Sequence, residues 1–458
     1  MMLTDEILNH NKEKVEQMLL AGKDVNALDI YGYTPLIEAA IANDHAIAAL
    51  LIEHGAEVNK KDLVGSTALH WAVENHNMPL CELLLAKGAD PNVYTKYGQP
   101  ILVQPLLRHQ QDLKELLYRS RADLKFAQDY INTKLIGHRF ELAGRVDIVD
   151  SKGKFIEVDF EGFVLEFTIA IIQDSLLSFR NNFAARNLRS HFTELDAMIA
   201  AFQTAAELQR YQQYMTDISL HRGRIDNLAR RDLLLMPVGY EGHAITFIRY
   251  GDLFAKCDRG ENSLRNPSVM IYKMRDPRAF TPEFVRFLLY KKQNRYFVTE
   301  GIVQALDLEM IADLPLPSQL IGNCSWANVE AVVPTMLYMF WLYENPAASP
   351  GDKRRYQDLA QAIYKQWLEW DKDWALHQCV ESFYDASPAR KASKAALLAA
   401  VLFQTCHYAV PQDLQRANKI LAVLSEANYQ YVLESYLKVY KKTEAARNLL
   451  ELMDLYSK

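Results

Sequence analysis

The chain of 458 residues has few cysteines, no large excess of charge of either sign and no long uncharged apolar run. Five widely spaced cysteines do not make a disulfide framework, and an odd number leaves at least one thiol free, which favours a reducing compartment. A net charge of -6 gives no global reason to expect direct nucleic-acid binding. Because no run reaches 18 uncharged apolar residues, we expect no membrane span.

Motifs for cofactors and metals are missing as well. No GxGxxG, P-loop or HExxH pattern occurs, so we expect no cofactor and no resident metal. His377 with Cys379, and Cys406 with His407, lack the paired spacing of a zinc site, and we expect these side chains to pack in the core. The first residues have neither the basic nor the apolar segment of a signal peptide.

What the sequence does contain is an internal repeat of 33 residues in its first part. Thr34 and Thr67 are suited to cap helices, and Pro35 is suited to a first helical turn. Gly55 and Gly88 stand where the following helices should end with a positive φ. The dipeptides that mark the repeat are Val25-Asn26, Val58-Asn59 and Pro91-Asn92.

This pattern resembles ankyrin repeats, three clear and a fourth degenerate, over residues 1–127. The resemblance implies an all-α solenoid that binds a host protein through its turn tips and first helices. It also places His70 at a turn-supporting position. Asn26, Asn59 and Asn92 fall where the family has a turn-bracing asparagine, a residue that host asparaginyl hydroxylase modifies in some members. Modification of these residues is a minor hypothesis.

The period disappears after the repeats, and we expect an α+β domain over residues 128–344. A strand hairpin is predicted around residues 150–154, helices over 169–232, and strands over 233–256 that break at two glycine turns. A further strand pair is predicted at 269–272 and 296–299, with a helix over 282–291 between them. Residues 325–343 have helical spacing, and 345–458 are predicted to be an all-helical C-terminal region.

Four polar residues in this middle region have the chemistry of a thiol hydrolase. Cys324 comes at the predicted start of a helix, where free N–H groups and the helix dipole favour a thiolate. His243 begins a predicted strand, and Asp258 follows 15 residues later, where an antiparallel return would bring it beside the imidazole. Gln319, with the backbone N–H of Cys324, could donate to an oxyanion. Taken singly, each residue has a structural explanation as a buried thiol, a strand end, a turn or a loop.

These segments resemble papain-fold cysteine peptidases. The similarity lies in the Gln-x4-Cys-x-Trp motif formed by Gln319, Cys324 and Trp326, and in the Gly242-His243 pair that precedes a predicted strand. In this chain the glutamine lies one residue closer to the cysteine than in papain, and the order is His, Asp, Gln, Cys. Papain has Gln, Cys, His, Asn, whereas the order found here is similar to that of the adenovirus-protease and SUMO-protease clan. The resemblance covers about 100 residues and implies a Cys324 nucleophile, a His243 base, an orienting Asp258 and an oxyanion donor in Gln319.

The combination of ankyrin repeats, a papain-like domain and a helical tail resembles the Dot/Icm-translocated ankyrin effectors of Legionella. That resemblance implies delivery by a type IV system into the host cytoplasm or nucleus, and Glu444, Glu451 and Leu455 fit a C-terminal secretion signal. We expect a cysteine protease-like hydrolase acting on an amide or isopeptide bond of a host protein that the repeats recruit. An acyltransferase is also possible on this chemistry.

Two other interpretations remain open at this stage. In the first, the ankyrin and papain-like domains form a non-catalytic scaffold that binds host proteins without turnover. In the second, the C-terminal helices are a tetratricopeptide-like module, although the sequence shows no obvious 34-residue period there.

Overall fold

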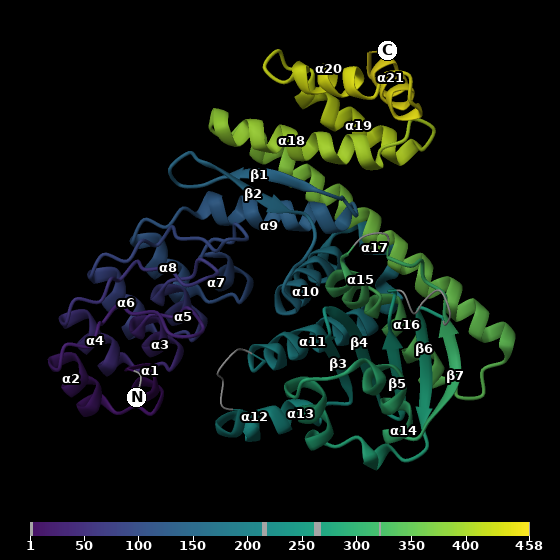
Figure 1. The fold of residues 1–458 in the computed structure, drawn as a ribbon. Coiled ribbons are helices and arrows are strands. Elements are labelled where there is room, and N and C mark those ends of the chain that lie inside the picture. The colour runs from purple at the N-terminus through teal and green to yellow at the C-terminus, as the bar shows by residue number, and fades with distance from the viewer. Residues whose placement is uncertain (1–2, 213–217, 261–266, 320–321, 458) are drawn as a thin grey trace. The chain divides into compact units, whose positions relative to one another are not determined.

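The computed structural model describes residues 3–212, 218–260, 267–319 and 322–457. The chain divides into two compact units (Figure 1). The first unit contains residues 1–134, 144–160 and 379–458, and the second contains 135–143 and 161–378. These units are not the three segments expected from the sequence, because the hairpin after residue 144 and the last helices group with the repeats.

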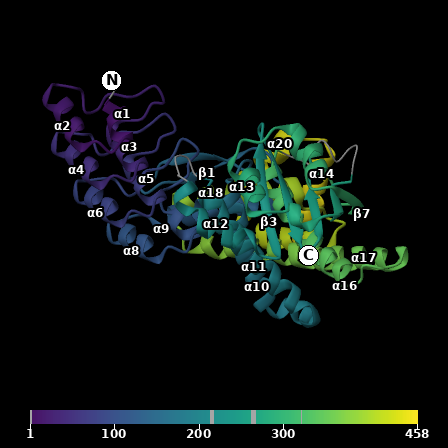
Figure 2. The ribbon, with the colours of Figure 1, turned by 90° about the horizontal axis from the view of Figure 1, so that it is seen from below.

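The first unit begins with a row of short helix pairs (Figure 2). Thr34 caps its helix by accepting from the Ile37 N–H at 3.1 Å, and Thr67 forms a capping box with His70. Ala39 and Ala72 are fully buried, and such small side chains let neighbouring helices approach closely. The helices are α1 (Leu3–Leu8), α2 (Lys12–Leu20), α3 (Pro35–Ile41), α4 (His45–Glu53), α5 (Ala68–Glu74), α6 (Met78–Ala86), α7 (Val103–Leu107) and α8 (Gln111–Arg119).

An asparagine in each repeat ties it to the next one. The side chain of Asn59 donates to the Gly88 carbonyl at 2.8 Å and accepts from the Asp90 N–H at 2.8 Å. Asn26 and Asn92 make the same pair of bonds one repeat earlier and one repeat later. The turn-bracing role predicted for these residues is therefore present in the structure.

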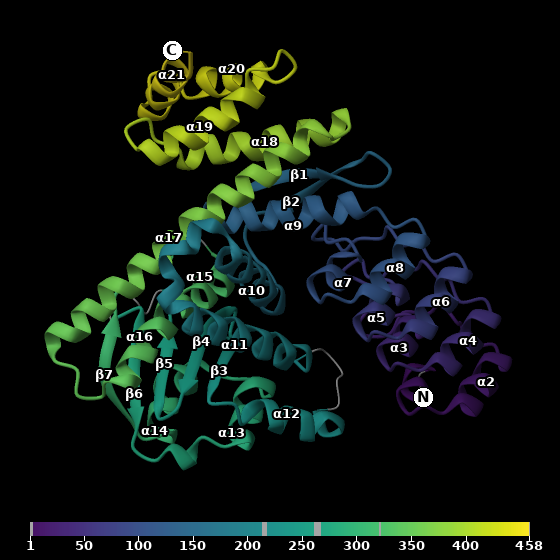
Figure 3. The same cartoon turned by 180° about the vertical axis from the view of Figure 1, so that it is seen from behind.

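Helices and a hairpin from later in the chain complete the first unit (Figure 3). Arg390 pairs with Asp123 at 2.5 Å and with Asp129 at 2.6 Å, and Ser393 donates to the Asp147 carbonyl. These bonds join segments that are more than 240 residues apart in the chain. The elements are α9 (Leu124–Arg139), which continues into the second unit, β1 (Arg145–Val149), β2 (Phe155–Asp159), α18 (Pro388–Thr405), α19 (Pro411–Leu424), α20 (Gln430–Val439) and α21 (Glu444–Ser457).

Within the described residues, the second unit has one antiparallel sheet in the order β3–β4–β5–β6–β7. Three of these strands are joined by tight turns at the predicted glycine positions, and Glu241 and Gly242 both have positive φ in the first turn. The strands are β3 (Leu233–Tyr240), β4 (His243–Tyr250), β5 (Leu253–Cys257), β6 (Val269–Met274) and β7 (Leu308–Leu314).

The prediction of a strand at 296–299 is wrong. Residues Phe297–Gly301 form a π-helical turn, η5, and β6 pairs instead with β7 on the side away from β5. The side chain of Asn294 accepts from the Phe297 N–H at 2.9 Å and starts this helical segment. Val298 is fully buried in the core beside the sheet, so packing decides the conformation of a short β-prone run.

Helices cover both faces of the sheet. One face packs on α12, α13 and η5 in a hydrophobic core that includes Phe247 and Phe254, and the other face contacts α15 and α16. The helical elements are α10 (Leu165–Asn181), η1 (Phe183–His191), α11 (Phe192–Arg210), η2 (Ile218–His221), α12 (Arg222–Ala229), η4 (Pro277–Ala279), α13 (Pro282–Tyr290), α14 (Ile302–Ala305), α15 (Cys324–Glu330), α16 (Val332–Glu344) and α17 (Pro350–Tyr384), whose last residues lie in the first unit. No helix of the described residues is long and apolar enough to cross a membrane.

Candidate functional site

Cys324 is the first residue of α15, as the start of the apolar pattern predicts. Trp326 and Val329 are buried and anchor this helix in the core beneath the sheet. All five cysteines lie in the described part of the chain, and Cys324 is the one that is not buried. Burial raises the pKa of Cys257 to about 12, so that thiol stays protonated at neutral pH.

The β4–β5 hairpin brings His243 and Asp258 together. Thr246 pairs with Cys257, so Asp258, the residue after β5, returns beside the beginning of β4. The Nε2 atom of His243 lies 3.2 Å from Oδ1 of Asp258. Asp258 is buried, while the His243 side chain keeps 24% of its accessible surface. The imidazole therefore has one ring nitrogen committed to a buried carboxylate and the other available for the thiol.

Cys324 and His243 lie close enough for each to change the other's pKa. Burial raises the pKa of the Cys324 thiol, but the hydrogen bond and charge of His243, with the N–H groups of Ala244 and Ser325, bring it below its usual value. Burial lowers the pKa of His243, but its bonds to Asp258 and Cys324 outweigh burial and raise it to about 9. Both shifts favour a thiolate beside an imidazolium at neutral pH.

The fourth predicted residue, Gln319, is held by its backbone. Its N–H donates to the Arg259 carbonyl at 2.9 Å, which places the residue next to the segment that follows Asp258. The side-chain Oε1 is buried and has no hydrogen-bond partner among the residues that the structure describes. The role of Gln319 as an oxyanion donor stays a prediction.

Sequence reasoning missed Gly260, which lies against the imidazole. A Cβ atom at this position would stand 2.6 Å from Cε1 and 2.9 Å from Nε2 of His243, closer than real Cβ contacts. The Gly260 N–H also approaches Oδ1 of Asp258 at 3.2 Å. A glycine two residues after a candidate acid was the available signal, because glycine permits close approach of a backbone to another group.

A second missed residue is Asn328, an amide between the apolar residues Ala327 and Val329 of α15. It is fully buried and forms hydrogen bonds to the backbone on both sides of the His243–Asp258 pair. The available signal was its polarity, because a buried amide needs hydrogen-bond partners.

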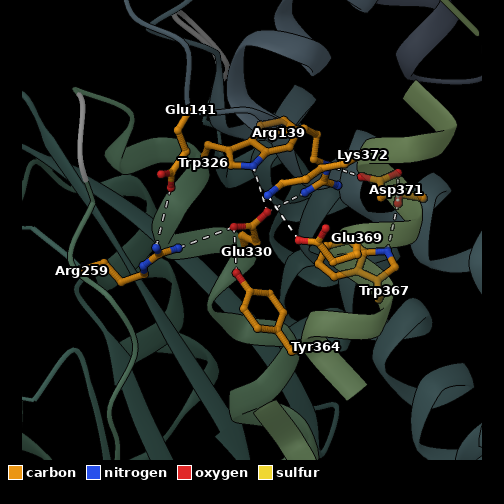
Figure 4. A network of polar contacts seen from close by, with 11 residues as sticks. Arg139, Glu141, Arg259, Trp326, Glu330, Tyr364, Trp367, Glu369, Asp371 and Lys372 are labelled. Carbon is orange, nitrogen blue, oxygen red and sulfur yellow. Dashed lines mark hydrogen bonds and ion pairs between the residues drawn. The ribbon is translucent and has the colours of Figure 1, made fainter. Parts of the chain in front are cut away.

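Behind Cys324, α15 is fixed by a buried network of polar and aromatic side chains (Figure 4). Glu330 accepts from Arg139 at 2.6 Å and from the Tyr364 hydroxyl at 2.9 Å, and it faces Arg259 at 3.5 Å. Arg139 also pairs with Asp371. The guanidinium of Arg139 lies 4.7 Å from the ring centroids of both Trp326 and Trp367. This network determines where the helix that begins at Cys324 lies.

Comparison with known proteins gives two matches and one negative result. A family model of ankyrin repeats matches three copies over residues 3–95. No curated protein sequence matches the chain. A solved structure, described as that of the Legionella effector AnkH, matches with a TM-score of 0.90 and 46% identity, over 100% of this chain and 97% of that one. The chain belongs to the AnkH family.

Membership of the AnkH family confirms the expectation of an ankyrin-repeat effector related to those of Legionella. The family model also confirms the ankyrin repeats themselves. The match to AnkH shows the family and the fold, and it does not by itself assign a reaction. For this member of the AnkH family, the papain-like assignment and the hydrolase chemistry therefore rest on the geometry around Cys324.

Proposed function

We propose that this protein is an effector translocated into a host cell, where it acts as a cysteine protease-like thiol hydrolase on a host protein. The observation that carries the proposal is the arrangement of Cys324, His243 and Asp258. A half-buried thiol starts a helix, an imidazole lies close enough to lower the pKa of that thiol, and a buried carboxylate accepts from the imidazole. The similarity to the effector AnkH supports delivery into a host cell.

In the proposed reaction, the Cys324 thiolate attacks the carbonyl carbon of an amide or isopeptide bond. The C–N bond breaks as the His243 imidazolium gives its proton to the leaving amine, and a thioester remains on Cys324. Water then attacks the thioester, His243 takes a proton from it, and the carboxylic acid leaves. If an amine replaces this water, the same thioester passes its acyl group on, and the protein is an acyltransferase.

The ankyrin repeats supply the means of recruiting a protein target. The turn tips of successive repeats carry large apolar side chains in water, with exposed fractions of 79% for Ile30, 71% for Leu63 and 62% for Tyr97. Exposed apolar side chains that gather on one edge of a domain mark protein-binding surfaces. This row also favours the second candidate, a scaffold that binds a host protein without turnover.

Labelling of Cys324 separates the two candidates. Iodoacetamide and ubiquitin- or peptide-based electrophiles would be applied to the wild type and to His243→Ala and Asp258→Asn, followed by peptide mapping. We expect rapid modification at Cys324, at least tenfold slower in His243→Ala, because the thiolate depends on the imidazolium. If Cys324 is modified as slowly as the amino acid cysteine in solution, or at the same rate in wild type and His243→Ala, the hydrolase proposal fails. The scaffold function is then the remaining candidate.

The pH dependence provides an internal check. The lowered pKa of Cys324 makes its alkylation rise at lower pH than that of an ordinary thiol. Turnover of a substrate additionally needs the imidazolium, which is lost as pH rises through about 9. We therefore expect a bell-shaped profile of kcat/KM that falls on the alkaline side near pH 9.

A further inference from the structure

Asn328 is a buried amide on the helix that begins at the candidate nucleophile. It lies four residues after Cys324, so the two side chains emerge from the same side of α15. Its side chain is fully buried, and both ends of its amide make short hydrogen bonds. Nδ2 donates to the Ala244 carbonyl at 2.6 Å, and Oδ1 accepts from the Arg259 N–H at 2.6 Å.

The two hydrogen-bond partners of Asn328 lie directly beside residues of the candidate site. Ala244 directly follows His243, and Arg259 directly follows Asp258. The backbone N–H of Ala244 also helps to lower the pKa of the Cys324 thiol. One side chain on the nucleophile's helix therefore holds the peptide units next to the base and next to the carboxylate.

The chemistry of the amide is also specific. One end must donate and the other must accept, and an asparagine provides both in a single planar group. A leucine has the same branched shape but provides neither, and it leaves the Ala244 carbonyl and the Arg259 N–H without their partner. Both groups would then be buried without a partner unless the backbone at Ala244 and Arg259 moved away from α15.

We propose that Asn328 is a positioning residue that sets the separation of Cys324 from His243 and Asp258 by bonding the backbone beside each of the latter two. It touches no reacting atom and acts through Ala244 and Arg259. The inference rests on the thiol–imidazole pair of the proposed function but not on turnover. It therefore holds equally for an enzyme and for a scaffold that retains the pair.

The test compares the ionisation of Cys324 and His243 in the full-length wild type and in a variant that lacks the Asn328 amide. The pH profile of Cys324 alkylation by iodoacetamide and the NMR titration of the His243 ring would be recorded for wild type and Asn328→Leu, with His243→Ala identifying the resonance. We expect alkylation at pH 6.5 to fall at least tenfold in Asn328→Leu. The apparent pKa of the thiol should rise toward its usual value, and that of His243 should fall from about 9.

Gln209→Leu is the matched control. Gln209 is a buried amide on α11 that donates to the Pro237 carbonyl of β3 at 3.0 Å, so its loss also removes an amide bond to the sheet. We expect this variant to lose stability and to keep the wild-type profiles. If Asn328→Leu does not fold, Asn328→Ala measured at low temperature removes the same two bonds without adding bulk.

The outcomes are distinct. A folded Asn328 variant with wild-type alkylation and titration profiles would overturn the inference and leave the proposed site intact. An ordinary thiol and an unshifted His243 in the wild type would overturn both proposals, because there would be no pair to position. A pair that forms in wild type and is lost in Asn328→Leu would support the inference even if no substrate is turned over.

Discussion

At the scale of single residues, Gly260 is where the candidate site has no room for a side chain. We expect Gly260→Ala to push the His243 ring away from Asp258, because the new Cβ would stand 2.6 Å from Cε1. The ring is the end of a side chain and can rotate, so the stability loss should be small, within roughly 1–3 kcal/mol. Iodoacetamide labelling of Cys324 at neutral pH should slow at least tenfold.

The control for this change is Gly239→Ala on β3. A Cβ there meets only the His243 carbonyl, at 3.9 Å, which is ordinary contact. Its labelling rate should match the wild type. Equal labelling rates in both variants would mean that the position of the imidazole does not govern the reactivity of Cys324.

The same residues show how far the sequence leads toward the site. The spacing of His243 and Asp258 across a turn, and Cys324 at a helix start, predict the three side chains that the structure brings together. Gly260 and Asn328 act through contacts that exist only after folding. Neither residue type belongs to the Cys, His and Asp pattern by which the site was predicted. The signals for these two residues were indirect: a glycine near an acid, and an amide between apolar neighbours in a helix.

At the scale of elements, the position of α15 depends on the buried ion pairs of Arg139. We expect Arg139→Met to destabilise the second unit by roughly 3–5 kcal/mol, because it removes the cation that pairs with buried Asp371 and leaves buried Glu330 with Arg259 as its remaining cation. Urea unfolding followed by tryptophan fluorescence suits this variant, since Trp326 and Trp367 flank the guanidinium.

Arg275→Met is a matched control in the same unit. Arg275 also faces two carboxylates, Asp307 at 3.7 Å and Glu309 at 3.5 Å, but its side chain is 63% exposed. Surface pairs contribute at most about 1 kcal/mol, so the urea midpoint should hardly move. Similar losses in the two variants would contradict the structural role of the buried network.

Element by element, the sequence predicts strands best where turns separate them. The strands from 233 to 257 are bounded by glycine turns and form as predicted. The run at 296–299 has β-branched and aromatic residues but becomes helical, because Asn294 caps it and Val298 fits the core beside the sheet. The strand Leu308–Leu314 carries exposed and half-buried positions at an edge, so its sequence lacks the apolar alternation that marks a buried strand.

At the scale of the whole molecule, the sequence indicates domains that follow one another along the chain. In the structure, residues 379–458 instead belong to the same compact unit as the repeats. Composition and period mark where one pattern changes to another along the chain. They contain no information on which distant segments share a core. The ion pairs of Arg390 with Asp123 and Asp129 could not be predicted for this reason. In the sequence, each of these residues looks like an ordinary charged residue on a helix surface.

We therefore expect Arg390→Met to weaken the entire first unit and not only the helices at the C-terminus. The substitution removes the cation that pairs with Asp123 and leaves Asp129 paired with Lys394, a loss of about 3 kcal/mol. A unit of this size then unfolds several degrees lower, at roughly 2–4 °C per kcal/mol. Arg145→Met is the control, since Arg145 faces Glu157 and Asp159 at 2.9 and 2.6 Å but is 59% exposed.

Hydrogen exchange shows where the stability is lost. If the first unit is cooperative, amides of α9, β1 and α18 should lose protection together in Arg390→Met, because bonds from α18 reach both Asp129 and the Asp147 carbonyl. Loss of protection confined to α18–α21 would instead mean that the C-terminal helices fold as the separate region expected from residues 345–458. The repeats that carry the apolar turn tips would then be stable without them, and target binding could be studied on the repeats alone.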